Sequence, residues 1–190
     1  MLRERTCGME KPRWRLRNSH YLVDSPYMRL RVDDVELPNG TIVPNYYVRE
    51  SRGYVVVAAL TGAGEILLVR QYRYGSDDIH LELPAGMLQD DEDPLECARR
   101  ELAEETGYGV DRCEPIAEFY AEPVRSTARA YVYLAHGARR LHEPQPDPTE
   151  HIEVELASLS EFRAMLRDGR INAGGSVAAG YLALERLALL

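Results

Sequence analysis

The stretch from Glu82 to Tyr108, ELPAGMLQDDEDPLECARRELAEETGY, constrains the fold most, because it specifies one helix from its start to its end. Asp93 is a typical N-cap residue, Pro94 suits the first helical position, and Glu96 is the partner expected three residues after the cap. Gly107 readily adopts the left-handed conformation that ends helices. We therefore predict a helix that begins after Asp93 and stops at Gly107.

This predicted helix has an apolar stripe beside an acidic one. At about 100° per residue, Leu95, Ala98 and Leu102 share a stripe that can face a core. Glu101, Glu104 and Glu105 share the neighbouring stripe, because residues three and four apart lie on one face. Three carboxylates repel one another unless a positive group lies among them, and hard cations such as Mg²⁺ prefer oxygen ligands. These residues alone leave two readings open, a solvated acidic face and a metal site.

The residues around the acidic stripe suit the hydrolysis of phosphoanhydrides. Such substrates are negatively charged, and a bound metal both offsets that charge and lowers the pKa of water. Arg100 lies four residues before Glu104, so we expect an ion pair between them. Glu92 is expected to accept from nearby backbone or to pair with Arg100. A carbonyl of the predicted turn at residues 84–86 can add a metal ligand, because Gly86 lets the chain bend close to the helix.

Length and charge exclude several other classes of protein. The 190 residues suit one domain with a small appendage, and the net charge of −8 argues against binding to nucleic acid or to an anionic membrane. No apolar run is long enough to span a bilayer. The three cysteines show neither paired nor metal-binding spacing. We therefore expect reduced thiols and a cytoplasmic location.

The order of predicted elements gives a loose tail at residues 1–12, a small antiparallel sheet at residues 13–50, and a catalytic domain at residues 51–190. Pro38 to Thr41 is predicted as a turn, because Pro fixes φ while Asn and Gly accept positive φ. A sheet this small needs a surface to cover it, either the main domain or a second subunit. We predict strands at residues 13–24, 27–37, 42–50, 54–60, 65–72, 80–83, 116–120, 129–135 and 152–156.

Two further helices are predicted near the C-terminus. Ser158 or Ser160 is expected to cap the first, which ends near Gly169, and Ser176 is expected to cap the second. The apolar face of the last helix is predicted to consist of Val177, Tyr181, Leu182, Leu184 and Leu187. Strands around a central helix, with helices at the end, indicate an α/β fold in which helices enclose a mixed sheet.

Residues 86–108 resemble the Nudix box. The match reads Gly86, five residues, Glu92, seven residues, Arg100-Glu101-Leu102, one residue, Glu104-Glu105, one residue, Gly107 and the apolar Tyr108. Three flanks are similar to the branch of ADP-ribose pyrophosphatases and nucleoside-diphosphate-sugar hydrolases: Arg70–Arg73 (RQYR), Glu82–Gly86 (ELPAG) and Ile171–Leu182 (INAGGSVAAGYL). The resemblance implies a Nudix-like α/β/α sandwich and a hydrolase that uses Mg²⁺ or Mn²⁺.

The resemblance also implies roles for particular residues. The metal ligands would be Ala85, through its carbonyl, with Glu101, Glu104, Glu105 and Glu150. Arg100 is expected to support catalysis, and Glu150 is the preferred late ligand or general base, with Asp147 and Glu153 as alternatives. Expected substrate contacts are Arg70, Arg73, Glu82 and Arg125. For Arg70 and Arg73 an ion pair on the strand face is the alternative, and for Glu150 and Arg125 an ordinary exposed charge.

The chain departs from this branch in its later loops. The branch usually has Ser-Pro-Gly followed by Glu after the box, whereas here only Pro123 is in place and Ala128 stands at the position of the Glu. Pro148 occupies the place of a frequently proposed base. From the box and its flanks, we predict hydrolysis of ADP-ribose or a nucleoside diphosphate sugar by a homodimer paired through the N-terminal sheet. The alternatives are another substrate, namely a GDP-sugar, a dinucleoside polyphosphate or a coenzyme, and a nucleotide sensor without turnover.

Overall fold

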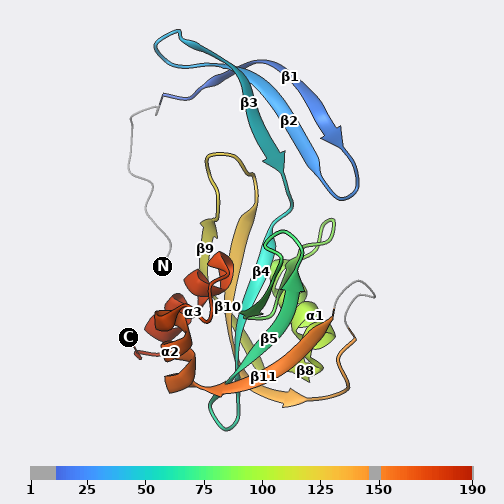
Figure 1. Ribbon diagram of the computed structural model, residues 1–190, viewed down its shortest axis with the longest axis vertical. Helices are drawn as coiled ribbons and strands as arrows, with labels where there is room; N and C mark the ends of the chain where they lie inside the picture. The colour runs from blue at the N-terminus through green and yellow to red at the C-terminus, as the bar shows by residue number, and fades with distance from the viewer. Residues whose placement is uncertain (1–11, 146–150, 190) are drawn as a thin grey trace. The chain divides into compact units, whose positions relative to one another are not determined.

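The computed structural model describes residues 12–145 and 151–189 (Figure 1). These residues form two compact units. Within the described chain, the smaller unit contains residues 12–51 together with Val124–Ser126, and the larger contains Arg52–Pro123 and the residues from Thr127 onward. The predicted loose tail lies outside the described residues, apart from Pro12.

The smaller unit is a three-stranded antiparallel sheet in the order β1-β2-β3. Its strands are β1 (Arg15–Asp24), β2 (Arg29–Glu36) and β3 (Ile42–Glu50). The predicted turn before β3 is confirmed, because Gly40 has a φ of 84° and the Leu37 N–H donates to the Thr41 carbonyl at 2.8 Å. Several apolar side chains of β1 are exposed, among them Leu16 at 58% and Leu22 at 60%.

The larger unit is built on a mixed sheet with the strand order β11-β5-β4-β10-β8. Strands β6, β7 and β9 pair with β5, β4 and β10, respectively, and β10 runs parallel to β4. The strands are β4 (Tyr54–Thr61), β5 (Glu65–Arg73), β6 (Asp78–Glu82), β7 (Ala85–Met87), β8 (Tyr108–Gly109), β9 (Arg112–Tyr120), β10 (Arg129–Arg140) and β11 (Ile152–Ser158).

Strand β4 lies at the centre of this unit, and its alternate side chains reach two separate cores. Val55 and Val57 pack with α1 (Pro94–Thr106), whereas Val56 and Ala58 pack with α2 (Leu159–Asp168) and α3 (Gly174–Arg186). Because successive strand residues point to opposite faces, the sheet has α1 on one side and α2 with α3 on the other (Figure 1). This arrangement confirms the predicted α/β/α sandwich.

The helix signals were correct where they depend on neighbouring residues. Asp93 caps α1, and Gly107 ends it at a φ of 76°. Ser158 caps α2 in a reciprocal pair with Glu161, and Gly169 ends that helix at a φ of 81°. Within the described residues, none of the helices is long and apolar enough to cross a membrane.

Two sequence predictions about local structure were wrong. The turn predicted at residues 84–86 is largely strand, because Ala85 and Gly86 pair with β4. Ser176 does not cap α3: Ala173 holds the N-cap position, and the Ser176 hydroxyl accepts the N–H of Leu83 at 3.0 Å.

The buried face of α3 also differs from the predicted one. It consists of Ser176, Ala179, Gly180, Ala183 and Leu184, whereas Tyr181 is 37% exposed. Small residues are needed because α3 lies close to α2: a Cβ at Gly180 would come within 2.9 Å of Phe162 and Leu166.

Candidate active site

Helix α1 fixes the position of the acidic side chains. Its Asp93 cap accepts the N–H groups of Leu95 at 2.8 Å and Glu96 at 3.4 Å, so the first turn is held locally. Ala98 and Leu102 are buried against the sheet, as the apolar stripe predicts. The packing of this stripe determines the direction in which the acidic stripe points.

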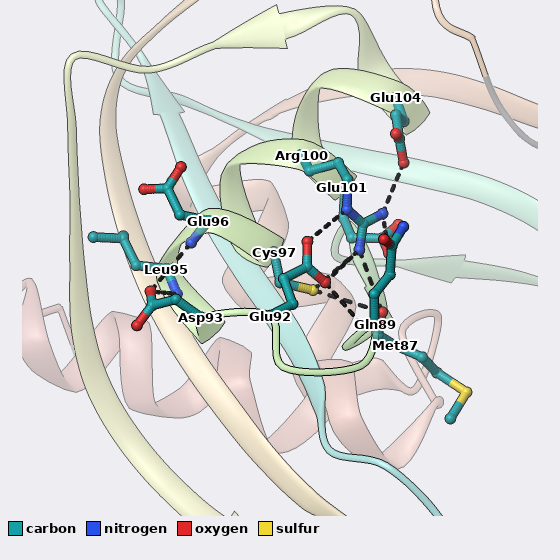
Figure 2. Close-up of polar contacts among 10 residues, drawn as sticks. All are labelled: Met87, Gln89, Glu92, Asp93, Leu95, Glu96, Cys97, Arg100, Glu101 and Glu104. Carbon is teal, nitrogen blue, oxygen red and sulfur yellow. Dashed lines mark hydrogen bonds and ion pairs between the residues drawn. The ribbon is translucent and has the colours of Figure 1, made fainter.

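Arg100 hydrogen-bonds to two carboxylates of the acidic stripe and to Glu92 (Figure 2). Its guanidinium donates to both carboxylate oxygens of Glu92, at 2.7 and 2.9 Å. It also donates to Glu101 at 2.8 Å and to Glu104 at 2.9 Å. The backbone carbonyl of Met87 accepts a further hydrogen bond from Arg100, at 3.3 Å. The expected pair with Glu104 is thus one part of a larger network, because one planar guanidinium can serve several acceptors.

The charges in this network stabilise one another. Hydrogen bonds from Arg100 hold the pKa of Glu92 at about 2, well below its ordinary value of 4.5. The hydrogen bonds to Glu92, with the charge of Glu101 and the hydrogen bonds to Glu104 and Glu101, raise the pKa of Arg100. Glu92 also accepts the N–H of Gln89 at 2.8 Å, so both roles expected of Glu92 are observed.

Glu101 lies directly against the backbone of Gly86. A Cβ at residue 86 would stand 1.9 Å from the carboxyl carbon of Glu101 and 2.2 Å from each of its oxygens. Gly86 is not among the positive-φ glycines of the described residues, so close approach rather than backbone conformation requires glycine here. The strand at residues 85–87 and the acidic helix therefore meet at this point.

Glu105 is buried at 3% exposure and accepts the N–H of Ala85 at 3.0 Å. The structure thus brings together Ala85, Arg100, Glu101, Glu104 and Glu105. Nearby Cys97 is fully buried, and burial raises the pKa of its thiol to about 12. The Cys97 thiol therefore stays protonated at neutral pH, which does not suit a nucleophile.

The oxygen donors of this site fit a hard divalent cation. Glutamate carboxylates and a backbone carbonyl are the ligand types that Mg²⁺ and Mn²⁺ favour, and the missing side chain of Gly86 lets the Glu101 carboxylate lie against the strand. Among the described residues, however, no three acidic, histidine or cysteine side chains already form a metal cage. In the structure, Arg100 binds Glu101 and Glu104, and Glu105 binds the Ala85 amide.

The predicted substrate-binding residues lie at different places. Arg73 forms a two-pronged ion pair with the buried Glu82, at 3.0 and 2.8 Å. Arg70 pairs with Glu155 on the neighbouring strand at 2.5 Å. Arg125 belongs to the smaller unit, where its carbonyl accepts the Arg49 N–H at 2.8 Å.

The sequence offers three acidic candidates for a late metal ligand or general base. Glu150 and Asp147 lie outside the described residues. Glu153 is described, on β11 opposite Arg70.

Sequence reasoning missed two contacts that shape the site, the Glu105 bond to the Ala85 amide and the Ser176 bond to the Leu83 amide. A weak signal for the second was present, because Ser176 is a polar residue near the start of an otherwise apolar helix. No local pattern could have indicated its partner, which is 93 residues away.

The α/β/α sandwich and the acidic helix opposite Gly86 define a Nudix protein, and comparison with known families agrees. The NUDIX domain model matches residues 50–177, and the model of the nucleoside diphosphate sugar hydrolase N-terminal domain matches residues 14–48. The chain therefore belongs to the Nudix hydrolase family.

Similar proteins include several named pyrophosphatases. An ADP-ribose pyrophosphatase of Bacillus subtilis is 35% identical over 82% of this chain and 85% of its own length. A methanol dehydrogenase activator of Bacillus methanolicus is 35% identical over 83% and 86%, and a GDP-mannose pyrophosphatase of Pectobacterium atrosepticum is 30% identical over 86% and 87%. A crystal structure of an ADP compounds hydrolase shares the fold with a TM-score of 0.81, at 20% identity, covering 97% of this chain and 100% of that one.

Proposed function

We propose that this protein hydrolyses the pyrophosphate bond of ADP-ribose or of a nucleoside diphosphate sugar, giving a nucleoside monophosphate and a sugar phosphate. The observation that carries this proposal is the junction of the acidic helix with the Ala85–Gly86 strand, where Glu101 touches Gly86 and Glu105 binds the Ala85 amide. Relatives named ADP-ribose pyrophosphatase and GDP-mannose pyrophosphatase support this substrate class.

We assign the metal-binding role to Glu101, Glu104, Glu105 and the Ala85 carbonyl, with Glu150 as a further ligand or base. The ion is Mg²⁺, with Mn²⁺ as a substitute. When bound, it supplies charge neutralisation to the pyrophosphate and a lowered pKa to an attacking water.

The protein groups around the metal ligands have a different task. Arg100 keeps the carboxylates of Glu101 and Glu104 on one side of the helix, and Glu92 fixes Arg100 in turn. Arg73 and Arg70 are assigned to bind the substrate phosphates. On substrate binding, Arg73 would exchange Glu82, and Arg70 would exchange Glu155, for phosphate oxygens. Arg125 is assigned to the substrate as well.

The test is incubation of the purified protein with Mg²⁺ and a panel containing ADP-ribose, GDP-mannose, a dinucleoside polyphosphate and a coenzyme. We expect nucleoside monophosphate and sugar phosphate from the wild type, and a loss of orders of magnitude in kcat for Glu105→Gln, which keeps the side-chain shape but removes the charge. Unchanged turnover in Glu105→Gln would refute the site assignment. Saturable binding without any turnover would identify a nucleotide sensor instead.

We further propose that the protein forms a homodimer that pairs through the N-terminal sheet. We also propose that it is located in the cytoplasm. The exposed apolar side chains of β1 support the dimer, because isolated small sheets are marginally stable. Cys97 and Cys113 are free thiols, which supports a reducing location. Light scattering at micromolar concentration tests the dimer: a monodisperse monomer would contradict it.

A further inference from the structure

The segment Leu83–Ala85 is held from three directions. The Leu83 N–H donates to the hydroxyl of Ser176 on α3 at 3.0 Å, and the Pro84 carbonyl accepts the Val57 N–H of β4 at 2.8 Å. The Ala85 N–H donates to Glu105 on α1 at 3.0 Å. Three consecutive residues are thus fixed by three different elements, two of which lie on opposite faces of the sheet.

The contact with Ser176 is formed where water is excluded. Leu83 has no exposed surface, and Ser176 is only 3% exposed. A buried N–H without a partner is strongly disfavoured. The Ser176 hydroxyl supplies the acceptor that allows the Leu83 N–H to be buried at this position. Helix formation itself does not require serine, because alanine is the better helix former. The hydroxyl is therefore explained by its contact with Leu83.

A second contact joins the start of α3 to the same part of the chain. Asn172 lies just before α3, and its side-chain oxygen is 2.7 Å from Nδ1 of His80 on β6. The other ring nitrogen, Nε2, is 2.6 Å from the Ser76 hydroxyl. Residues 172 and 176 thus contact the chain at His80 and at Leu83, on either side of Glu82.

We propose that Ser176 is a positioning residue for the metal site, with Asn172 as a weaker second support. Ser176 sets the place of Leu83, and the chain from Leu83 to Ala85 is too short and too tightly bonded to absorb a shift. The Ala85 carbonyl, and the surface that Gly86 presents to Glu101, therefore depend on a hydroxyl from the opposite face of the sheet. This inference rests on the proposed function, in which Ala85 and Glu101 hold the metal.

The experiment measures Mn²⁺ binding directly, by electron paramagnetic resonance without substrate, for the wild type, Ser176→Ala and Ser176→Thr. We expect Ser176→Ala to weaken Mn²⁺ binding about tenfold or more, because loss of groups that orient metal ligands typically has this effect. Ser176→Thr keeps the hydroxyl and should restore most of the affinity. Amide hydrogen exchange in the metal-free protein should speed up at Leu83 and Ala85 in Ser176→Ala.

The matched control is Ala183→Gly, a buried position two turns further along α3 whose side chain has no hydrogen-bonding group. This change weakens the helix without removing a hydroxyl. Equal Mn²⁺ affinity in Ser176→Ala and Ala183→Gly would reduce Ser176 to a purely structural residue and overturn the proposal.

Two further outcomes keep the test decisive. If Ser176→Ala does not fold, Asn172→Ala replaces it, because Asn172 is exposed. We expect this variant to bind Mn²⁺ a few-fold more weakly than the wild type. Unchanged Mn²⁺ affinity would overturn the proposal. A wild type that binds no Mn²⁺ would overturn the metal assignment and this inference together. That result differs from failure of the inference alone, in which the wild type binds Mn²⁺ and the variants bind it equally well.

Discussion

Replacing Gly86 by alanine isolates the contact between the strand at residues 85–87 and the acidic helix. The new Cβ would stand 1.9 Å from the carboxyl carbon of Glu101, whereas an ordinary contact is at least 3.4 Å. The Glu101 carboxylate must therefore retreat by roughly 1–1.5 Å, and a misplacement of about 1 Å can cost about 100-fold in rate. We expect kcat for the proposed Mg²⁺-dependent hydrolysis to fall about 100-fold.

The same change should leave the fold intact. The backbone of Gly86 does not need a positive φ, so alanine also restricts the unfolded chain and can contribute about 0.4–1 kcal/mol of stability. The expected result is thus a large loss of kcat with an unchanged or slightly raised Tm. Gly62→Ala is the matched control, because a Cβ there meets nothing within 4 Å and the residue has no positive φ; its activity should equal that of the wild type.

The reasoning would be refuted by either of two results from steady-state kinetics and thermal melting. Near-wild-type kcat in Gly86→Ala would mean that the position of Glu101 against Gly86 is not required for turnover. A fall in Tm of many degrees would mean that Glu101 cannot move aside, so that lost activity would reflect unfolding.

Two more predictions concern pH and metal. The pKa of Glu92 is lowered to about 2 in the folded protein from an ordinary 4.5, so its ion pair stabilises the fold fully above about pH 4.5 and this contribution is lost as the pH falls toward 2. Melting curves of the wild type should therefore lose Tm across this range more steeply than those of Glu92→Gln, and parallel curves would contradict the assignment. Mg²⁺ at about 100 times its Kd should stabilise the folded state by about 2.7 kcal/mol, which raises Tm by about 5–10 °C in a chain of this size. The Glu105→Gln variant should show little of this shift, and an equal shift in both proteins would place the metal elsewhere.

The parts of the fold that sequence predicted are those set by near neighbours or by regular alternation. Asp93, Gly107 and Gly169 act within one turn of a helix, and all three take the predicted roles. The strand predicted at residues 54–60 is confirmed as β4, whose nearly continuous apolar run is buried, as is typical of a strand covered on both faces.

The errors arose where a distant partner competes with a local role. Ser176 has the typical side chain of an N-cap, but the Leu83 amide from 93 residues away binds its hydroxyl inside the helix. Residues 84–86 contain typical turn residues, yet β4 supplies hydrogen-bonding partners that extend the chain into a strand. Spacing along α1 placed its carboxylates on one face but could not show that Arg100 would contact Glu92, Glu101 and Glu104 at once.

The position of Arg100 has a consequence for the proposed metal site. Its guanidinium already offsets the charge of Glu101 and Glu104, so the metal-free protein does not carry a bare acidic face. Under the proposed function, a cation that binds these carboxylates must compete with Arg100, so that metal binding exchanges one positive partner for another. Such an exchange lowers the net gain on binding. With the proposed metal ligands, the metal-free protein can therefore remain folded before an ion binds, and the ion can leave again without leaving Glu101 and Glu104 unpaired.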